Sequence, residues 1–81
     1  MPHEEIFSTL KDIVTKLNPA IDTAGATEET RLTDDLGMDS LTLLLMALRC
    51  ESVFGIRFEN LQPSSFQTVG DVCVYIEGKL Q

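Results

Sequence analysis

The first part of the chain carries apolar residues at helical spacing, which predict a helix over residues 4–17. Two glutamates at its beginning, Glu4 and Glu5, suit the positive end of a helix. Proline disfavours helical geometry at the residue before it, so Asn18 and Pro19 are expected to end this helix. One face is expected to be buried and consists of Ile6, Phe7, Leu10, Ile13, Val14 and Leu17.

A second helix is predicted over residues 40–54, and it carries two apolar stripes on nearly opposite sides. In a small bundle only one side of such a helix is buried, so we expect the other to be an exposed contact surface. The alternative is a broader core that contains both stripes. The stripe expected inside is Leu43, Met46, Cys50 and Phe54, and the stripe expected outside is Leu41, Leu44, Leu45 and Leu48.

Residues 18–39 lack convincing periodicity and are expected to form a long loop between these helices. Isolated apolar residues at Ile21, Leu32 and Leu36 are expected to anchor it to the bundle. The acidic residues of this segment outnumber its single cation, Arg31. They have two interpretations, a solvated loop or a surface for basic partners, and we favour the second for Asp35 and Asp39, which lie closest to the second helix.

The remaining segments predict two further helices. Gly55 can cap the second helix. Apolar and charged residues alternate from residue 56 onward, which indicates a short extended link over residues 56–58. Residues 59–66 predict a short third helix or turn, with Leu61 and Phe66 pointing inward. Thr68 and Asp71 have the spacing of a capping box, so the last helix is expected to begin at Thr68. Its buried stripe is expected to be Val69, Val72, Cys73, Ile76 and Leu80.

This order of elements predicts an all-α fold, a small four-helix bundle in one domain over residues 1–81. It has three longer helices plus one short helix, with the long loop between helices 1 and 2.

The chain is acidic, with a formal net charge of −7 over 81 residues. Nucleic acid phosphates would repel such a surface, whereas basic patches on partner proteins would be attracted. No apolar run is long enough to span a bilayer, and the first five residues do not resemble a signal peptide. We therefore expect a soluble, cytoplasmic monomer that does not insert into membranes.

The cysteines and the histidine give no indication of a metal site or of catalysis. Cys50 and Cys73 lack metal-ligand spacing and lie in apolar segments, so we expect buried small apolar residues rather than a disulfide. His3 is expected to be a solvated side chain in a mobile terminus.

The candidate chemistry lies at the start of the second helix. Gly37 suits a sharp turn, and Asp39 and Ser40 are both good capping residues. A phosphate on the Ser40 hydroxyl would meet free backbone N–H groups at the positive end of a helix dipole. A nucleophilic serine needs a nearby base, and the only histidine is far away in the sequence. The protein is therefore expected to be a substrate of enzymes and not an enzyme.

The sequence Asp-Leu-Gly-Met-Asp-Ser-Leu at residues 35–41 resembles the attachment motif of acyl carrier proteins. The resemblance includes Leu32 and continues through residues 54–56 and 68–71 to residues 75–76, so it covers nearly the whole chain. It implies that Ser40 carries a 4′-phosphopantetheine arm from coenzyme A, flanked by Gly37, Asp39 and Leu41. Acyl intermediates would be held on this arm as thioesters for fatty acid, polyketide or specialised lipid biosynthesis.

The resemblance also implies partners and a place for the cargo. The partners would be a phosphopantetheinyl transferase and the acyl-loading, acyl-transfer or synthase enzymes. The gap between the second and fourth helices would receive the acyl chain, although each residue proposed there could equally be ordinary core. The proposed lining is Met46, Cys50, Phe58, Phe66 and Val72.

The second helix departs from the family pattern, because Leu45 and Arg49 stand where many carriers of fatty acid synthesis have acids. This difference favours a specialised carrier whose dedicated partner binds mainly through apolar contacts. Two alternatives remain, an aminoacyl or peptidyl carrier and an unmodified helical interaction module. Asp39 before the serine favours the acyl type. The residues assigned to partner binding are Asp35, Leu44, Leu45, Leu48 and Glu51.

Overall fold

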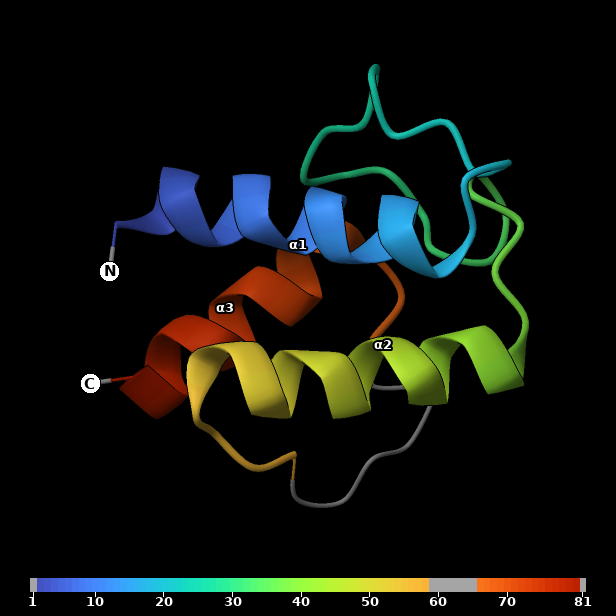
Figure 1. Ribbon diagram of the computed structural model, residues 1–81. Coiled ribbons are helices and arrows are strands. Elements are labelled where there is room, and N and C mark those ends of the chain that lie inside the picture. The colour runs from blue at the N-terminus through green and yellow to red at the C-terminus, as the bar shows by residue number, and fades with distance from the viewer. Residues whose placement is uncertain (1, 59–65, 81) are drawn as a thin grey trace.

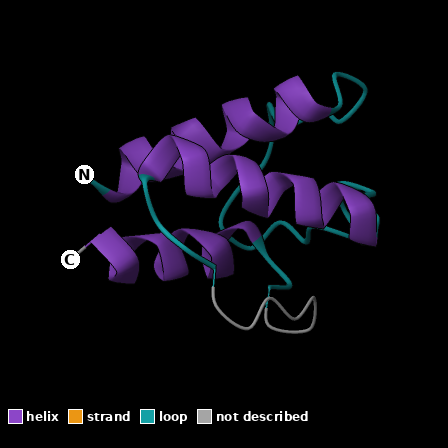
Figure 2. Cartoon of the chain, turned by 60° about the horizontal axis from the view of Figure 1, so that its bottom comes forward, coloured by secondary structure: helices purple, strands orange, loops and turns teal. Residues whose placement is uncertain are grey.

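The structure is a computed structural model that describes residues 2–58 and 66–80 (Figure 1). In these ranges the chain forms three helices: α1 (His3–Leu17), α2 (Ser40–Phe54) and α3 (Val69–Leu80). α1 and α2 lie side by side in opposite directions, and α3 packs against α1 (Figure 1 and Figure 2). The all-α prediction is confirmed for these residues, which form no strand beyond one isolated bridge between Arg31 and Thr68. None of these three helices is both long and apolar enough to cross a membrane.

Local capping sets the ends of α2 and explains why its predicted bounds are confirmed. The Asp39 carboxylate accepts the N–H of Thr42 at 2.8 Å, so one free donor of the first turn is satisfied. At the other end Gly55 takes a left-handed conformation, with φ of 67° and ψ of 36°. Its N–H donates to the carbonyl of Glu51 at 2.9 Å, which closes the helix.

The predicted capping box at the start of α3 is also confirmed. The Thr68 hydroxyl accepts the N–H of Asp71, and the Asp71 carboxylate accepts the N–H of Thr68, both at 3.1 Å. The same carboxylate accepts the N–H of Gln67 at 3.0 Å. Asp71 therefore orders the two residues that lead into the helix.

One apolar core lies between the helices and follows the predicted stripes with one correction. Leu80 is 38% exposed, although its spacing predicts burial. It lies one turn beyond Glu77, which already contacts the first residue of α1, so α1 does not extend far enough to cover it. Phe7 and Leu17 are only partly buried. The fully buried centre consists of Ile6, Leu10, Leu32, Cys50, Val72, Cys73 and Ile76.

Residues 18–39 connect α1 to α2 and are tied to the beginning of α3 by backbone hydrogen bonds. The N–H of Leu32 donates to the carbonyl of Gln67 at 2.9 Å, and the N–H of Val69 donates to Thr30 at 3.0 Å. Gly70 donates to Glu28 at 2.9 Å, and a Cβ at Gly70 would lie 2.9 Å from the same carbonyl oxygen. Glycine is therefore required where this connecting segment crosses α3.

His3 is not the solvated side chain that the sequence predicts. It is the first residue of α1, its Nδ1 lies 2.6 Å from a Glu77 carboxylate oxygen, and its Nε2 lies 2.6 Å from Glu28. The hydrogen bonds with Glu77 and then Glu28 raise the pKa of His3 above its ordinary value. These partners are 74 and 25 residues away in the sequence, so local pattern could not predict them.

The two cysteines are buried, as expected for small apolar residues. Cys50 and Cys73 have no exposed surface, and both thiols are free. Burial raises the pKa of Cys50 to about 12 and that of Cys73 to about 11. Both therefore stay in the unreactive thiol form at neutral pH.

The predicted short helix over residues 59–66 falls almost wholly outside the described residues, as does Leu61. Phe66 is described and half-buried. Its ring packs edge-on against Phe58 and Tyr75, with centroid distances of 5.7 and 5.3 Å. Phe58 and Tyr75 stack on each other at 4.9 Å, so this aromatic cluster joins the segment after α2 to α3.

Candidate functional site

Gly37 makes the turn that leads into α2. Its φ of 69° is a left-handed conformation that residues with a side chain rarely adopt. Met38 is buried, and its N–H donates to the carbonyl of Leu32 at 3.0 Å. The turn thereby fixes the entry of the chain into α2 and leaves Ser40 exposed as the first residue of the helix.

Asp39 and the first turn of α2 create an environment that suits a phosphate. The hydrogen bond from the Thr42 N–H lowers the pKa of the Asp39 carboxyl, so this side chain is ionised at neutral pH. Within the described residues, the N–H groups of Ser40 and Leu41 have no acceptor. Two donors at the positive end of a helix therefore remain beside the Ser40 hydroxyl, where a phosphodiester would accept from them.

Asp35 has a structural role in the preceding turn. Its carboxylate accepts the N–H of Arg31 at 2.8 Å, and the Asp35 N–H donates to the carbonyl of Arg31 at 3.1 Å. Asp34 pairs with the Arg31 guanidinium at 3.4 Å on the surface. Asp35 is nonetheless exposed, so its side chain also contributes to the acidic surface of the segment that precedes α2.

Among the described residues, no histidine lies beside Ser40 to act as a catalytic base. His3 lies at the far end of the bundle from the start of α2 (Figure 1), with both ring nitrogens engaged by glutamates. The described residues contain no group of three or more His, Cys, Asp or Glu side chains that could hold a metal ion. The arrangement suits a serine that accepts a group from another enzyme.

The outer face of α2 is exposed, as predicted for this stripe, so the alternative of a broader core that contains both stripes is wrong. Leu41 is 64% exposed and Leu48 is 52% exposed, with Leu44 and Leu45 close behind. The inner stripe of Leu43, Met46, Cys50 and Phe54 is buried, and so is Ala47 between them. The helix is thus apolar on both sides but covered on one.

Glu51 has a defined contact at the edge of this face. Its carboxylate accepts the N–H of Phe58 at 2.8 Å and so holds the segment that follows α2. The side chain is half-buried. This internal contact is a structural role that the sequence pattern does not reveal.

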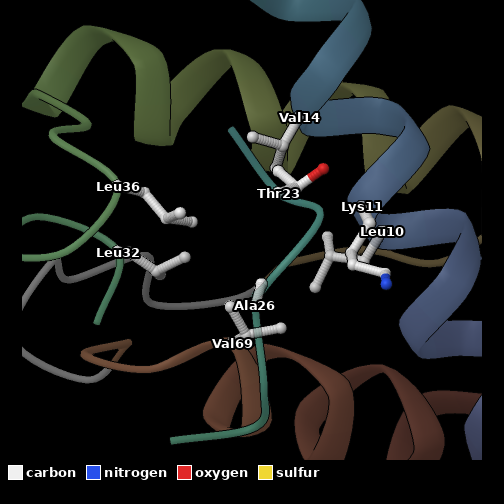
Figure 3. Close-up of a pocket in the computed structure, with 8 residues that line it drawn as sticks. All are labelled: Leu10, Lys11, Val14, Thr23, Ala26, Leu32, Leu36 and Val69. Carbon is white, nitrogen blue, oxygen red and sulfur yellow. The ribbon is translucent and has the colours of Figure 1, made fainter. Parts of the chain in front are cut away.

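The residues considered for an acyl pocket are closely packed. Met46, Cys50 and Val72 are buried, and Phe58 and Phe66 belong to the aromatic cluster. A small apolar pocket lies elsewhere, between α1 and the segment that connects it to α2 (Figure 3), and its free volume of about 10 Å³ equals roughly one water. Its lining consists of Leu10, Lys11, Val14, Thr23, Ala26, Leu32, Leu36 and Val69.

Leu17 is only partly buried: it packs against the core, as the helical pattern predicts, and also contributes to the surface. It lines a hollow of about 300 Å³ between α1 and α2, together with Leu45, Leu48, Arg49 and Ser52. Spacing alone cannot show this position, because Leu17 continues the buried face of α1. Leu17 is the last residue of α1, and this is the only local signal that its side chain is partly exposed.

Comparison with known proteins shows the family to which the chain belongs. Residues 8–76 match the protein family described as "Phosphopantetheine attachment site". The acyl carrier protein of Thermotoga maritima is 43% identical over 77 residues, which cover 95% of this chain and 94% of that protein. The acyl carrier protein of Coprothermobacter proteolyticus is 40% identical over 80 residues, covering 99% and 96%.

A relative with a more specific name is similar over most of the chain. The meromycolate extension acyl carrier protein of Mycolicibacterium smegmatis is 32% identical over 74 residues, covering 91% of this chain and 74% of that protein. The fold and the exposed serine at a helix start define a carrier domain. The chain belongs to the acyl carrier protein family, whose members carry acyl groups on covalently attached 4′-phosphopantetheine and are not enzymes.

Members of this family interact with a phosphopantetheinyl transferase and with acyl-handling enzymes. An exposed hydroxyl and free N–H donors at the start of α2 are compatible with both encounters.

Proposed function

We propose that Ser40 is the attachment residue for 4′-phosphopantetheine and that the chain carries acyl intermediates for fatty acid, polyketide or specialised lipid biosynthesis. The observation that carries this proposal is the exposed Ser40 hydroxyl at the first position of α2. Gly37 sets the approach, Asp39 caps the helix, and Leu41 offers an exposed apolar side chain beside the arm.

The residues around Ser40 have distinct roles in this proposal. When attached, the arm supplies a terminal thiol that holds an acyl group as a thioester. The N–H groups of Ser40 and Leu41 orient the phosphodiester, while the fixed cap at Asp39 keeps the first turn of the helix rigid. The acidic side chains of Asp35 and Asp39 attract basic groups on approaching enzymes.

The attachment can be tested by incubating the protein with coenzyme A and a broad-specificity phosphopantetheinyl transferase and then measuring its intact mass. The wild-type protein should gain the mass of one phosphopantetheine, whereas Ser40→Ala should gain none. Ser52→Ala removes another exposed serine of α2 and should react as the wild type does. Absence of a mass gain in the wild-type protein would favour an unmodified interaction module instead.

The proposal includes a dedicated partner that docks on the outer face of α2. Support comes from the exposure of the leucines on this face, which no other described part of the chain covers. The proposed contacts are Asp35, Leu44, Leu45, Leu48 and Glu51.

We also propose that the acyl chain enters between α2 and α3. Flexible methionine and small cysteine side chains let a closely packed core open around a guest. The side chains that would separate are Met46, Cys50, Phe58, Phe66 and Val72. Observation of acyl-dependent chemical shift changes at these residues would test the assignment.

We propose the finer architecture by analogy with the same family. The protein is proposed to be a cytoplasmic monomer with one domain over residues 1–81. Its bundle would contain the long loop between the first two helices and a fourth, short helix within residues 59–66.

A further inference from the structure

A groove between α1 and α2 is distinct from the acidic region around Ser40. It consists of two adjoining hollows that share Arg49, and we call them together the α1/α2 groove. The first hollow, of about 300 Å³, is lined by Leu17, Leu45, Leu48, Arg49 and Ser52. The second hollow, of about 200 Å³, is lined by Thr9, Asp12, Ile13, Lys16, Arg49 and Val53.

Part of the groove lining is apolar, and we call this part the floor: it consists of Ile13, Leu17, Leu45, Leu48 and Val53, beside polar and charged residues that form the rest. Leu45 is 42% exposed and Val53 is 49% exposed, although both are large apolar side chains. α1 and α2 lie side by side (Figure 1), and residues of both helices line each of the two hollows. An elongated apolar groove between two helices is the shape that receives the apolar face of a third helix.

The charge beside this floor is unusual for the chain. The protein has 13 acidic residues and only six Lys and Arg, yet two of those cations, Lys16 and Arg49, line the same hollow. Asp12 is the one acid there, so the hollow has a net positive charge. Among the described residues neither Lys16 nor Arg49 forms an ion pair, whereas Arg31 pairs with Asp34.

We propose that the α1/α2 groove binds an amphipathic α-helix of a partner protein that brings apolar side chains to the floor and a carboxylate to Lys16 and Arg49. The carboxylate would form ion pairs with Lys16 and Arg49, two exposed cations that have no ion pair within the described residues. Polar groups at the edge of such an interface select the partner and fix its register. This inference rests on the docking surface proposed above, because Leu45 and Leu48 belong to both, and it adds the shape and charge of the partner; it does not depend on attachment at Ser40.

The groove is close enough to Ser40 to matter for a carrier. Leu45 lies five residues after Ser40 on the same helix, which corresponds to about 7.5 Å along the axis. A partner helix in the groove would therefore contact α2 within two turns of Ser40, whereas the acidic residues Asp35 and Asp39 precede Ser40 in the chain and lie outside the lining of the groove. The two surfaces select opposite charges.

The test uses two synthetic helical peptides that differ only in charge. Both carry leucines at positions i, i+4 and i+7, and one has glutamates beside them where the other has lysines. We expect the glutamate peptide to bind the wild-type protein about tenfold more tightly than the lysine peptide, as two exposed ion pairs would allow. Backbone amide shifts should change in α1 and α2 along the groove.

Charge reversal supplies the decisive comparison. Lys16→Glu combined with Arg49→Glu should invert the preference between the two peptides, whereas Arg57→Glu alters an exposed cation outside the groove and should not. Circular dichroism verifies that each variant remains folded. Equal affinity for both peptides, absence of binding, or shifts centred on residues 34–39 would overturn the proposal. Concentration-dependent self-association through the groove would also overturn it, because the occupant would then be a second copy.

Discussion

The two faces of α2 carry the same kinds of side chain but have opposite surroundings. Leu43 on the inner face is 7% exposed, whereas Leu48 on the outer face is 52% exposed. Periodicity separates these two faces but does not show which one is buried, since both are apolar. The contacts with α1 and α3 decide which face stabilises the fold and which remains available to partners.

The largest expected effect comes from truncating one leucine on each face. Leu43→Ala should lower the free energy of unfolding by about 2–5 kcal/mol, because it leaves a cavity in the core. Leu48→Ala should lower it by only about 1 kcal/mol, because the side chain is already half exposed. Urea unfolding followed by circular dichroism measures both values. Similar losses for the two variants would mean that the faces do not differ in this way.

A smaller effect is expected at the turn that positions α2. Gly37→Ala should cost about 1–2 kcal/mol, because a side chain at a left-handed residue is strained even though no atom crowds it. Gly25→Ala is the matched control, since Gly25 also has open space but no positive φ. Thermal unfolding of the two variants distinguishes them, and equal stability would contradict the strained turn.

The stability that His3 provides by linking the start of α1 to α3 and to the connecting segment is expected to depend on pH. Because the folded protein raises the pKa of His3 above 6.5, its contribution is fully present below that value. The contribution is lost as the pH rises through the higher pKa of the folded state. His3→Gln should remove this part of the pH dependence, with Glu28 and Glu77 kept unchanged. A wild-type unfolding curve that matches His3→Gln at every pH would contradict the interaction.

The smallest effect on stability is expected from Leu45→Glu on the outer face. The helix content should stay unchanged, because Leu45 is 42% exposed, while affinity for an acyl-handling enzyme that uses the carrier should fall. Circular dichroism and a binding titration measure the two properties. Collapse of the fold would assign Leu45 to the core, and unchanged affinity would remove it from the docking surface.

The parts of this fold that sequence predicts are those set by neighbouring residues. Asp39 and Gly55 cap α2, and Thr68 with Asp71 begins α3, so these helix ends follow from local chemistry. The same is true of the exposed Ser40, since its position depends on the adjacent turn.

The parts that sequence misses depend on distant partners. His3 contacts Glu77 and Glu28 only after three segments have come together, and Gly70 is needed only because Glu28 crosses above it. The exposure of Leu80 depends on where α1 begins. Likewise, the shared hollow of Lys16 and Arg49 becomes visible only when two helices are placed side by side.

Peptide mapping of the phosphopantetheinylated protein tests the central claim most directly. Cleavage after Arg31 and Arg49 releases residues 32–49, in which Ser40 is the only serine. Tandem mass spectrometry should place one phosphopantetheine on Ser40 in this peptide and none elsewhere. A modification on any other residue would contradict the assignment of the start of α2 as the carrier site.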